Sequence, residues 1–280
     1  MKSIIADAGA TKTDWVLAEN GRILARVFTL GINPFHEDEA AITRIVTEEL
    51  LPNLPKEAEG ADIHFYGAGC TPEKCISMEA ILHKLFPKSQ HVTVLSDLWG
   101  AAHALCLHEA GIACILGTGS NSCYYDGKQI VLNTPPLGYI LGDEGSGAVL
   151  GKLFVADVLK GIMPQDLAKQ FLSESSLTKE VILNHVYRGE LPSRFLASVV
   201  PFISKMRHVQ EVHYLAIRNF RNFFSRNLKP YGHSDLPVNF IGGFAYGWSD
   251  ELHEAAELEG FHIGNIEKSP IDGLVEFHSK

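Results

Sequence analysis

The turn after the first apolar segment is the part of the sequence whose residue types best suit chemistry. Residues 3–7 have the pattern of a strand that ends in Asp7, and the turn that follows contains Gly9, Ala10, Thr11, Lys12 and Thr13. Small residues let backbone N–H groups approach an anion, while the hydroxyls and the lysine add donors and positive charge. Asp7 could support Mg²⁺, directly or through water. A phosphate site and a plain hairpin turn with a solvated lysine are equally compatible with this pattern.

A second turn of the same kind occurs in a matching part of the chain. Residues 3–7, 14–18 and 22–27 read as three strands joined by turns, and residues 111–116, 123–125 and 128–132 repeat that layout. In both segments an Asn-Gly or Asp-Gly dipeptide marks the second turn. The first turn of the repeat holds Gly117, Thr118, Gly119 and Ser120. The repeat predicts a duplicated domain in which two facing turns clamp one polyphosphate, although each turn alone is also typical of a hairpin.

Asp97 lies where an open α/β sheet places its functional groups. It follows a predicted strand, residues 91–95, and opens a predicted helix, residues 97–108. Ligands bind at the carboxyl ends of such strands. A carboxylate there can accept the proton of an attacking hydroxyl. An aspartate that merely caps the helix would occupy the same place.

Two further glycine-rich segments are weaker candidates. Asp143 and Glu144 lie between glycines just before a predicted helix, so Asp143 could bind sugar hydroxyls or serve as the helix cap. Gly242 and Gly243 follow a predicted strand, and paired glycines allow a flat ring to lie against the backbone.

The elements that position these residues follow from periodicity and turn signals. They predict a mixed sheet with covering helices in the first half and more helix in the second half. The expected helices are residues 37–51, 71–86, 143–160, 205–229, 249–259 and 272–278, and the further strands are residues 62–66 and 236–241. Residues 164–201 look helical and polar, and we assign them no chemistry.

Composition narrows the function classes. The chain has 280 residues and a formal net charge of −9, so nucleic acid is not an expected partner. The start lacks the pattern of a signal peptide, and no apolar run is long enough to span a membrane, so we expect a cytoplasmic protein. The five cysteines form no CxxC pair, which favours reduced core thiols over disulfides or zinc.

Together these segments resemble the sugar kinase, hsc70 and actin superfamily, and within it the N-acetylglucosamine kinase branch grouped with the BadF/BadG/BcrA/BcrD ATPases. The resemblance covers nearly the whole chain and implies an α/β fold of two RNase-H-like domains flanking a cleft. The implied domains are residues 1–108 plus 269–280, with the last helix packed back, and residues 109–268 with a helical insertion. A homodimer stays open, since dimers are common in the family.

The resemblance also implies roles. Asp97 would deprotonate the 6-hydroxyl of an N-acetylated amino sugar, N-acetylglucosamine or N-acetylmuramic acid. ATP and Mg²⁺ would be required. The first turn, with Asp7 supporting Mg²⁺, would grip the phosphates opposite Thr118 and Gly119. The sugar would be held by Asn33, Asp97, Ser120, Asn121 and Asp143, and adenine would lie beside Gly242 and Gly243.

Two other functions stay open. A BadF-type ATPase that activates a partner enzyme would carry an iron–sulfur cluster held by cysteines at a dimer interface, and residues 142–147 contain no cysteine. A non-catalytic sugar sensor would be expected if Asp97 or the phosphate turns were broken, and they are intact.

Overall fold

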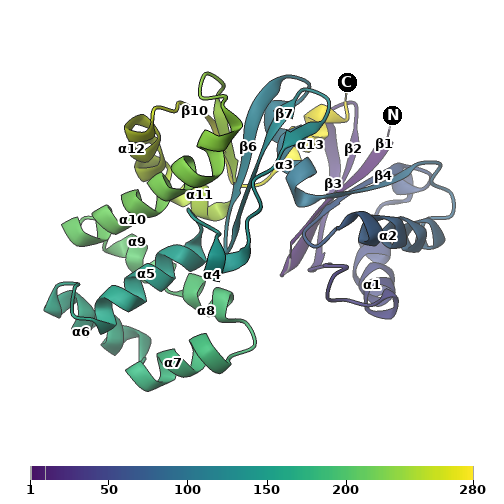
Figure 1. Ribbon diagram of the computed structural model, residues 1–280. Helices are drawn as coiled ribbons and strands as arrows, with labels where there is room; N and C mark the ends of the chain where they lie inside the picture. Colours follow the sequence, from purple (N-terminus) through teal and green to yellow (C-terminus); the bar gives the residue numbers. More distant parts are fainter. Residues whose placement is uncertain (1, 10, 280) are drawn as a thin grey trace. The chain divides into compact units, whose positions relative to one another are not determined.

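The computed structural model describes residues 2–9 and 11–279, and the chain divides into two compact units, each built on one five-stranded sheet (Figure 1). Unit 1 comprises Met1–Glu109, Asp126–Ile130 and Ser269–Lys280. Unit 2 comprises Ala110–Tyr125 and Val131–Lys268. None of the helices in these described ranges is both long and apolar enough to cross a membrane.

The sheet of unit 1 has the strand order β3-β2-β1-β4-β5. Its strands are β1 (Lys2–Ala8), β2 (Lys12–Glu19), β3 (Arg22–Leu30), β4 (Asp62–Gly67) and β5 (Val92–Ser96). Strand β1 runs antiparallel to β2 and parallel to β4, and β4 runs parallel to β5. The carboxyl ends of β1, β4 and β5 therefore meet at one edge, where Asp7 and Asp97 lie.

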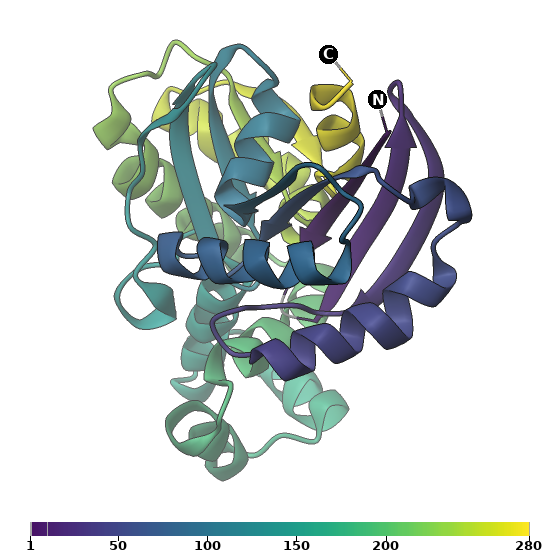
Figure 2. The same cartoon turned by 90° about the vertical axis from the view of Figure 1, so that its right-hand side faces the viewer.

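Helices cover both faces of this sheet because its inner strands are apolar on both sides. Helices α1 (Glu39–Ile45) and α2 (Pro72–Leu85) run across one face (Figure 2). Helices α3 (Asp97–Cys106) and α13 (Ile271–Phe277) pack on the other, with Leu274 of α13 against Ile5 and Val16 of the sheet. Thr71 caps α2 by accepting a hydrogen bond from the Lys74 N–H, and Pro72 opens the first turn, as the sequence predicts.

The helix expected at residues 37–51 is shorter than predicted. Helix α1 ends at Ile45 and continues as a π-helical turn, Val46–Leu50, and a 3-10 turn, Leu51–Asn53. Pro52 lacks an N–H, so a regular α-helical hydrogen bond is lost where the helix changes type.

The sheet of unit 2 repeats the strand order of unit 1. The order β8-β7-β6-β9-β10 matches β3-β2-β1-β4-β5 position by position, which confirms the predicted duplication. The strands are β6 (Ala110–Leu116), β7 (Ser120–Asp126), β8 (Ile130–Leu132), β9 (Val238–Ile241) and β10 (Ile263–Glu267). We did not predict β10, because its sequence IGNIE contains neither an apolar run nor a clear alternation.

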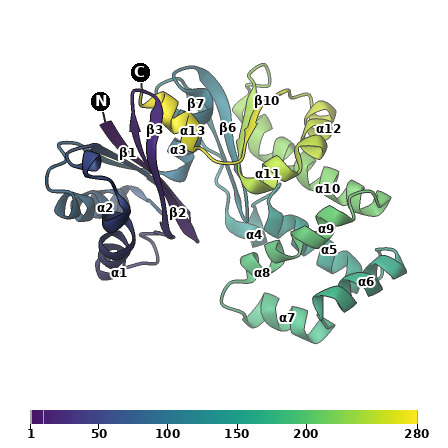
Figure 3. The ribbon, with the colours of Figure 1, turned by 180° about the vertical axis from the view of Figure 1, so that it is seen from behind.

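Figure 3 shows the helices of unit 2, all of which except the short exposed one at residues 138–141 contribute to one apolar core. They are α4 (Gly138–Leu141), α5 (Gly147–Leu159), α6 (Gln165–Ser175), α7 (Lys179–Arg188), α8 (Pro192–Ser198), α9 (Val200–Lys205), α10 (Gln210–Phe223), α11 (Gly243–Gly247) and α12 (Ser249–Glu259). The core joins Phe154 of α5 and Phe220 of α10 to Phe240 of β9. The helix predicted at residues 205–229 begins later, at Gln210, and ends in a π-helical turn, Phe224–Leu228.

The helix predicted to begin at Asp143 begins instead at Gly147. Ser146 is its N-cap, and the Ser146 hydroxyl accepts a hydrogen bond from the Val149 N–H. Asp143 and Gly145 have φ values of 53° and 77°, and the left-handed region cannot be part of a right-handed helix. Asp143 is therefore free of a capping role.

An aromatic and histidine cluster secures the C-terminal helix in unit 1. The Tyr66 hydroxyl hydrogen-bonds His103 Nδ1 and His278 Nε2, both at 2.9 Å, and the His64 ring stacks on that of His278 with centroids 3.7 Å apart. Burial lowers the pKa of His103 to about 4 and that of His278 to about 3, with nearby histidines adding to each shift. All three histidines of the cluster are therefore neutral in the native state at pH 7.

We expect the unfolding free energy to fall as the pH drops below about 6.5, because unfolded histidines bind protons that the buried ones do not. The substitution His278→Gln removes one such group while retaining an amide that can reach Tyr66. Between pH 7.5 and pH 5, the unfolding free energy of the variant should fall by about 1–2 kcal/mol less than that of the native protein. Urea unfolding at the two pH values checks this, and equal losses in both proteins would contradict it.

Candidate active site

Three carboxylates gather near the carboxyl edge of the unit 1 sheet. Asp7 is the penultimate residue of β1, Asp14 faces it across the β1–β2 ladder, and Asp97 follows β5. Burial and, to a smaller extent, the charges of Asp14 and Asp97 together raise the pKa of Asp7 to about 7, against the opposing effect of Lys12. The carboxylates at this edge of the sheet therefore stabilise positive charge, such as that of a bound cation.

Asp14 is a member of this group that the sequence analysis missed. It is 4% exposed and accepts two hydrogen bonds from Arg26 of β3, from Nε at 2.9 Å and from Nη2 at 2.5 Å. Two hydrogen bonds from one guanidinium fix the orientation of the Asp14 carboxylate. Strand alternation is the signal that could have found it, because Lys12 and Asp14 are two residues apart and share a face of β2.

Asp97 lies one position inside its helix rather than at the N-cap. Ser96 is the N-cap of α3, Asp97 is its first helical residue, and Asp97 Oδ1 accepts a hydrogen bond from the Leu98 N–H at 2.9 Å. Ser96 therefore occupies the N-cap position predicted for Asp97, while the Asp97 carboxylate still binds an N–H of the first turn. Burial raises the pKa of Asp97, while the bond from Leu98 opposes that shift. A raised pKa makes the carboxylate a stronger proton acceptor.

The first glycine-rich turn presents only part of its predicted set on the side of Asp7. Thr11 and Lys12 are exposed, and Lys12 Nζ lies 5.0 Å from the centroid of the Phe28 ring. Thr13 is fully buried on the opposite face, where its hydroxyl accepts a hydrogen bond from the Ile32 N–H at 3.1 Å. The Gly9 N–H closes the turn on the Lys12 carbonyl at 3.0 Å, and Ala10 lies outside the described residues.

Asn33 is built into the same edge by a close contact with the loop after β4. A Cβ added to Gly69 would lie 2.0 Å from Asn33 Oδ1, so only glycine fits there. Asn33 Oδ1 accepts a hydrogen bond from the Phe35 N–H at 3.0 Å, and the Asn33 N–H donates to Glu37 Oε2 at 2.7 Å. The Asn33 side chain is therefore fixed before any ligand arrives.

The residues around Asp7 fit a magnesium ion that is shared with phosphates. In the part of the chain that the structure describes, no three His, Cys, Asp or Glu side chains are grouped to hold a metal by themselves. Mg²⁺ usually keeps several waters and takes one or two carboxylates plus substrate phosphate oxygens. Asp7, in the acidic surroundings described above, suits that role.

The second glycine-rich turn is held against the start of α5 in unit 2. The carbonyls of Gly117 and Thr118 accept hydrogen bonds from the N–H groups of Gly147 and Ala148, at 2.9 and 3.0 Å. These bonds occupy the first N–H groups of the helix, so an anion would have to meet the N–H groups of the turn itself. The Thr118 side chain is exposed and can add its hydroxyl.

Asp143 lies directly beside this turn. It is 9% exposed, and a Cβ added to Gly119 would lie 3.1 Å from Asp143 Oδ2. Burial raises its pKa to about 6, while backbone hydrogen bonds from Ser120 and Gly138 oppose the shift. Asn121 Oδ1 is occupied by the Ser122 N–H and by Asn133 Nδ2, at 2.9 and 3.0 Å.

The Gly242–Gly243 pair lies next to the same turn, because β6 and β9 are parallel neighbours with Ile115 opposite Ile241. Gly242 has a φ of 129°, and a Cβ added to it would lie 2.2 Å from the Leu116 carbonyl oxygen. Gly243 opens α11, and a Cβ there would have no neighbour within 4 Å. Gly242 is thus required by the backbone, whereas Gly243 leaves open space for a ligand.

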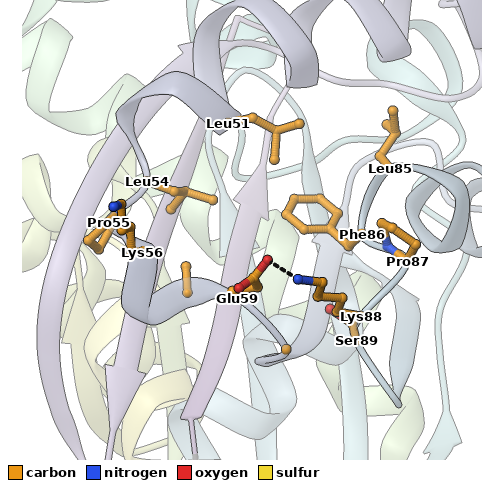
Figure 4. Close-up of a pocket in the computed structure, with 12 residues that line it drawn as sticks. Leu51, Leu54, Pro55, Lys56, Glu59, Leu85, Phe86, Pro87, Lys88 and Ser89 are labelled. Carbon is orange, nitrogen blue, oxygen red and sulfur yellow. Dashed lines mark hydrogen bonds and ion pairs between the residues drawn. The ribbon is translucent and has the colours of Figure 1, made fainter.

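A separate pocket of about 580 Å³ lies in unit 1, and none of its lining residues is a predicted site residue (Figure 4). It is walled by apolar side chains such as Leu54 and Phe86, and Lys88 Nζ pairs with Glu59 Oε1 at 2.5 Å. Its residues precede β4 and β5, while Asp97 follows β5. The length of a six-residue strand, about 20 Å, therefore separates it from the carboxylates.

Two units with the same strand order, each with a glycine-rich turn after its first strand and acidic residues near the strand ends, define the actin-like ATPase class of folds. Comparison with known proteins agrees with this class. No protein-family model and no curated protein matches the chain, whereas many solved structures do.

A crystal structure from Porphyromonas gingivalis, described as a "putative N-acetylglucosamine kinase", is 44% identical with a TM-score of 0.95, and the match covers 99% of this chain and 98% of that chain. The chain belongs to this N-acetylglucosamine kinase-like family of sugar kinases, within the actin-like ATPase superfamily. A protein of the same description from Chromobacterium violaceum is 19% identical with a TM-score of 0.77, covering 99% and 98%. A ROK hexokinase from Thermus thermophilus is 15% identical with a TM-score of 0.55, covering 99% and 96%. The last two comparisons bear on the fold alone.

Proposed function

We propose that the protein transfers the γ-phosphoryl group of ATP to the 6-hydroxyl of an N-acetylated amino sugar, with N-acetylglucosamine as the first candidate. The observation that carries the proposal is Asp97, a carboxylate with a raised pKa that follows β5 at the carboxyl edge of the sheet. The identity to the Porphyromonas gingivalis protein over the full length supports the substrate class.

In the proposed reaction Asp97 accepts the proton of the sugar hydroxyl as that oxygen bonds to the γ-phosphorus and the bond from phosphorus to the ADP oxygen breaks. Asp7 would hold Mg²⁺ through water, and the ion would neutralise charge on the phosphate oxygens. Thr11 and Lys12 of unit 1 and Thr118 and Gly119 of unit 2 would bind phosphates.

Each unit contains residues proposed for the sugar. Unit 1 contributes Asn33, whose amide is already oriented by Gly69 and by the Phe35 N–H. Unit 2 contributes Asp143 beside the second turn, with Ser120 and Asn121 nearby in sequence. Gly243, with open space above it, would border the adenine, and Gly242 would shape the turn that places it. Fixed polar groups of this kind orient a substrate at little entropic cost.

A coupled ADP-release assay with ATP and Mg²⁺ tests the proposal, using N-acetylglucosamine, N-acetylmuramic acid, N-acetylmannosamine, glucose and buffer alone. Release that depends on an amino sugar is the expected result, and ³¹P NMR of the product should place the phosphate on the 6-hydroxyl. Release only with N-acetylmuramic acid would identify that lactyl sugar as the substrate instead. ADP release that is equal with sugar and with buffer alone would contradict the proposed kinase activity and favour an ATPase.

The raised pKa of Asp7 gives the proposed Mg²⁺ site a defined pH dependence. Below about pH 7 the carboxyl is protonated and cannot support the ion, so the Mg²⁺ concentration for half-maximal ADP binding should rise about tenfold between pH 8 and pH 6. Calorimetry of ADP binding at several Mg²⁺ concentrations measures this half-maximal Mg²⁺ concentration at each pH.

The variant Asp14→Asn is the control for this dependence. It removes one of the charges that raise the pKa of Asp7, so the midpoint should move to lower pH. Protonation of the nucleotide is the same for both proteins, and identical profiles would show that Asp7 does not support the ion.

A further inference from the structure

Asp143 is held in a backbone conformation that a non-glycine residue seldom adopts. Its φ of 53° lies in the left-handed region, and it is flanked by Gly142 and, two residues on, by Gly145 with a φ of 77°. Such conformations persist only where the surroundings fix them, and they concentrate at functional sites. The contacts that fix this loop therefore determine the position of the Asp143 side chain.

Two of these contacts are local. The Asp143 N–H donates to the Pro136 carbonyl at 2.7 Å, and the Ser146 N–H donates to the Asp143 carbonyl at 3.1 Å. Gly142 is also confined, because a Cβ there would lie 1.9 Å from the Pro136 carbonyl oxygen. The first bond ties Asp143 to Pro136, and the second closes the turn that follows it; this second side of the loop, at residues 145 and 146, is also held by another element.

Helix α10 supplies that second side through one buried amide. Asn219 Oδ1 accepts a hydrogen bond from the Gly145 N–H at 3.1 Å, and Asn219 Nδ2 donates to the Ser146 carbonyl at 3.2 Å. The side chain thus bonds an N–H and a carbonyl of consecutive loop residues. A single asparagine fixes both the position and the orientation of that peptide segment.

Packing alone would not select asparagine at this position. Asn219 is 0% exposed and lies in the apolar stripe of α10 among Ala216, Phe220 and Phe223. A buried polar group is costly unless it is hydrogen-bonded, so an apolar side chain would satisfy the core better. Both the oxygen and the nitrogen of this amide hydrogen-bond the loop, so binding the loop explains why an asparagine occupies this position.

The neighbouring residues of the same helical face support the loop as well. Phe223, four residues on, packs so closely that a Cβ added to Gly145 would lie 2.7 Å from Phe223 Cβ. Arg226 Nε pairs with Glu144 Oε1 at 2.5 Å. Residues four and seven positions apart share a helical face, so α10 and the turn after it brace the loop along its length.

We propose that Asn219 is a positioning residue for sugar binding, which acts by holding Asp143 in its left-handed conformation beside the second glycine-rich turn. This inference rests on the proposed function, because Asp143 is assigned to the sugar there. Asn219 touches no substrate itself, and its effect should be confined to the ligand that Asp143 binds.

Three variants test the inference. Asn219→Ala removes both bonds, and Asn219→Asp keeps the acceptor for Gly145 but places a carboxylate oxygen against the Ser146 carbonyl. Asn222→Ala is the matched control, because Asn222 is an exposed asparagine on the same helix. The readouts are calorimetric Kd for N-acetylglucosamine, KM for sugar and for ATP, and Tm.

We expect the sugar Kd and KM to rise about tenfold or more in both Asn219 variants, while the KM for ATP stays within about twofold and Asn222→Ala matches the native protein. In an Asp143→Ala background the Asn219→Ala effect on sugar Kd should shrink to less than about twofold, because the group it positions is gone. The Tm of both Asn219 variants is expected to fall, and that loss alone does not distinguish a structural role.

Equal changes in the two KM values, or an undiminished effect in the Asp143→Ala background, would overturn the inference. Native sugar binding with an unchanged Kd in Asn219→Ala would remove this inference and leave the proposed function standing. If the native protein bound no amino sugar, the proposed function and this inference would both fail.

Discussion

The variant Asp97→Asn should lose about 10³-fold in kcat and retain the sugar affinity of the native protein. An amide cannot accept the hydroxyl proton, and general base catalysis contributes about 10²–10⁴-fold. The amide has nearly the shape of the carboxylate, and its oxygen can still accept the hydrogen bond from the Leu98 N–H. Ground-state binding of the sugar is therefore expected to persist while the transition state loses its proton acceptor.

The measurement is a pair of assays on the same protein, ADP release for kcat and calorimetry for sugar Kd. Asp62→Asn is the matched control, because Asp62 begins β4 at the opposite end of the sheet and should leave both values unchanged. Turnover in Asp97→Asn within tenfold of the native rate would remove Asp97 from the role of base. Loss of sugar binding together with turnover would make Asp97 chiefly a binding residue.

Replacing Gly242 by alanine should cost about 3 kcal/mol or more of unfolding free energy, whereas the same change at Gly243 should cost less than about 0.5 kcal/mol. At Gly242 the φ of 129° is open only to glycine, and the added Cβ would meet the Leu116 carbonyl oxygen at 2.2 Å. That oxygen belongs to the backbone at the end of β6 and cannot turn aside. At Gly243 the added methyl meets nothing within 4 Å.

Urea unfolding compares the two stabilities, and the KM for ATP compares the two functions. Gly243→Ala should fold normally and raise the KM for ATP several-fold, because its methyl enters the space proposed for the adenine. A fully stable Gly242→Ala would contradict the backbone requirement. If Gly243→Ala had the KM for ATP of the native protein, the proposal that adenine binds beside this turn would be contradicted.

Local patterns in the sequence were sufficient for much of the fold. Strands with clear alternation or an apolar run, such as β1 and β6, and helices with a capping residue, such as α2 with Thr71, lie where they were predicted. The duplication was visible because both copies keep the same order of strands and turns, and that order is a property of the chain itself. Strand β10 and the short helices α4 and α11 carry no such local signal.

The position of Asp97 after β5 also follows from sequence, since strand order alone places it at the carboxyl edge. Its role does not follow from sequence, because a capping aspartate and a catalytic base have the same sequence pattern. The structure places Ser96 at the N-cap and Asp97 one residue further on, and the role of base stays a proposal. In the same way, Thr13 looks like a third phosphate donor in sequence, and the two-residue period of β2 turns it to the opposite face from Lys12 and Asp14.

The sequence by itself determined the types of the reactive groups and the turns that carry them, because backbone preferences and periodicity act over a few residues. Tertiary structure alone decided which groups meet. Asp14 is neutralised by Arg26 from a neighbouring strand, and Asn219 reaches a loop more than seventy residues earlier in the chain. The left-handed backbone of Asp143 is likewise imposed by contacts with Pro136 and α10. Such contacts depend on long-range packing, which short-range patterns do not encode.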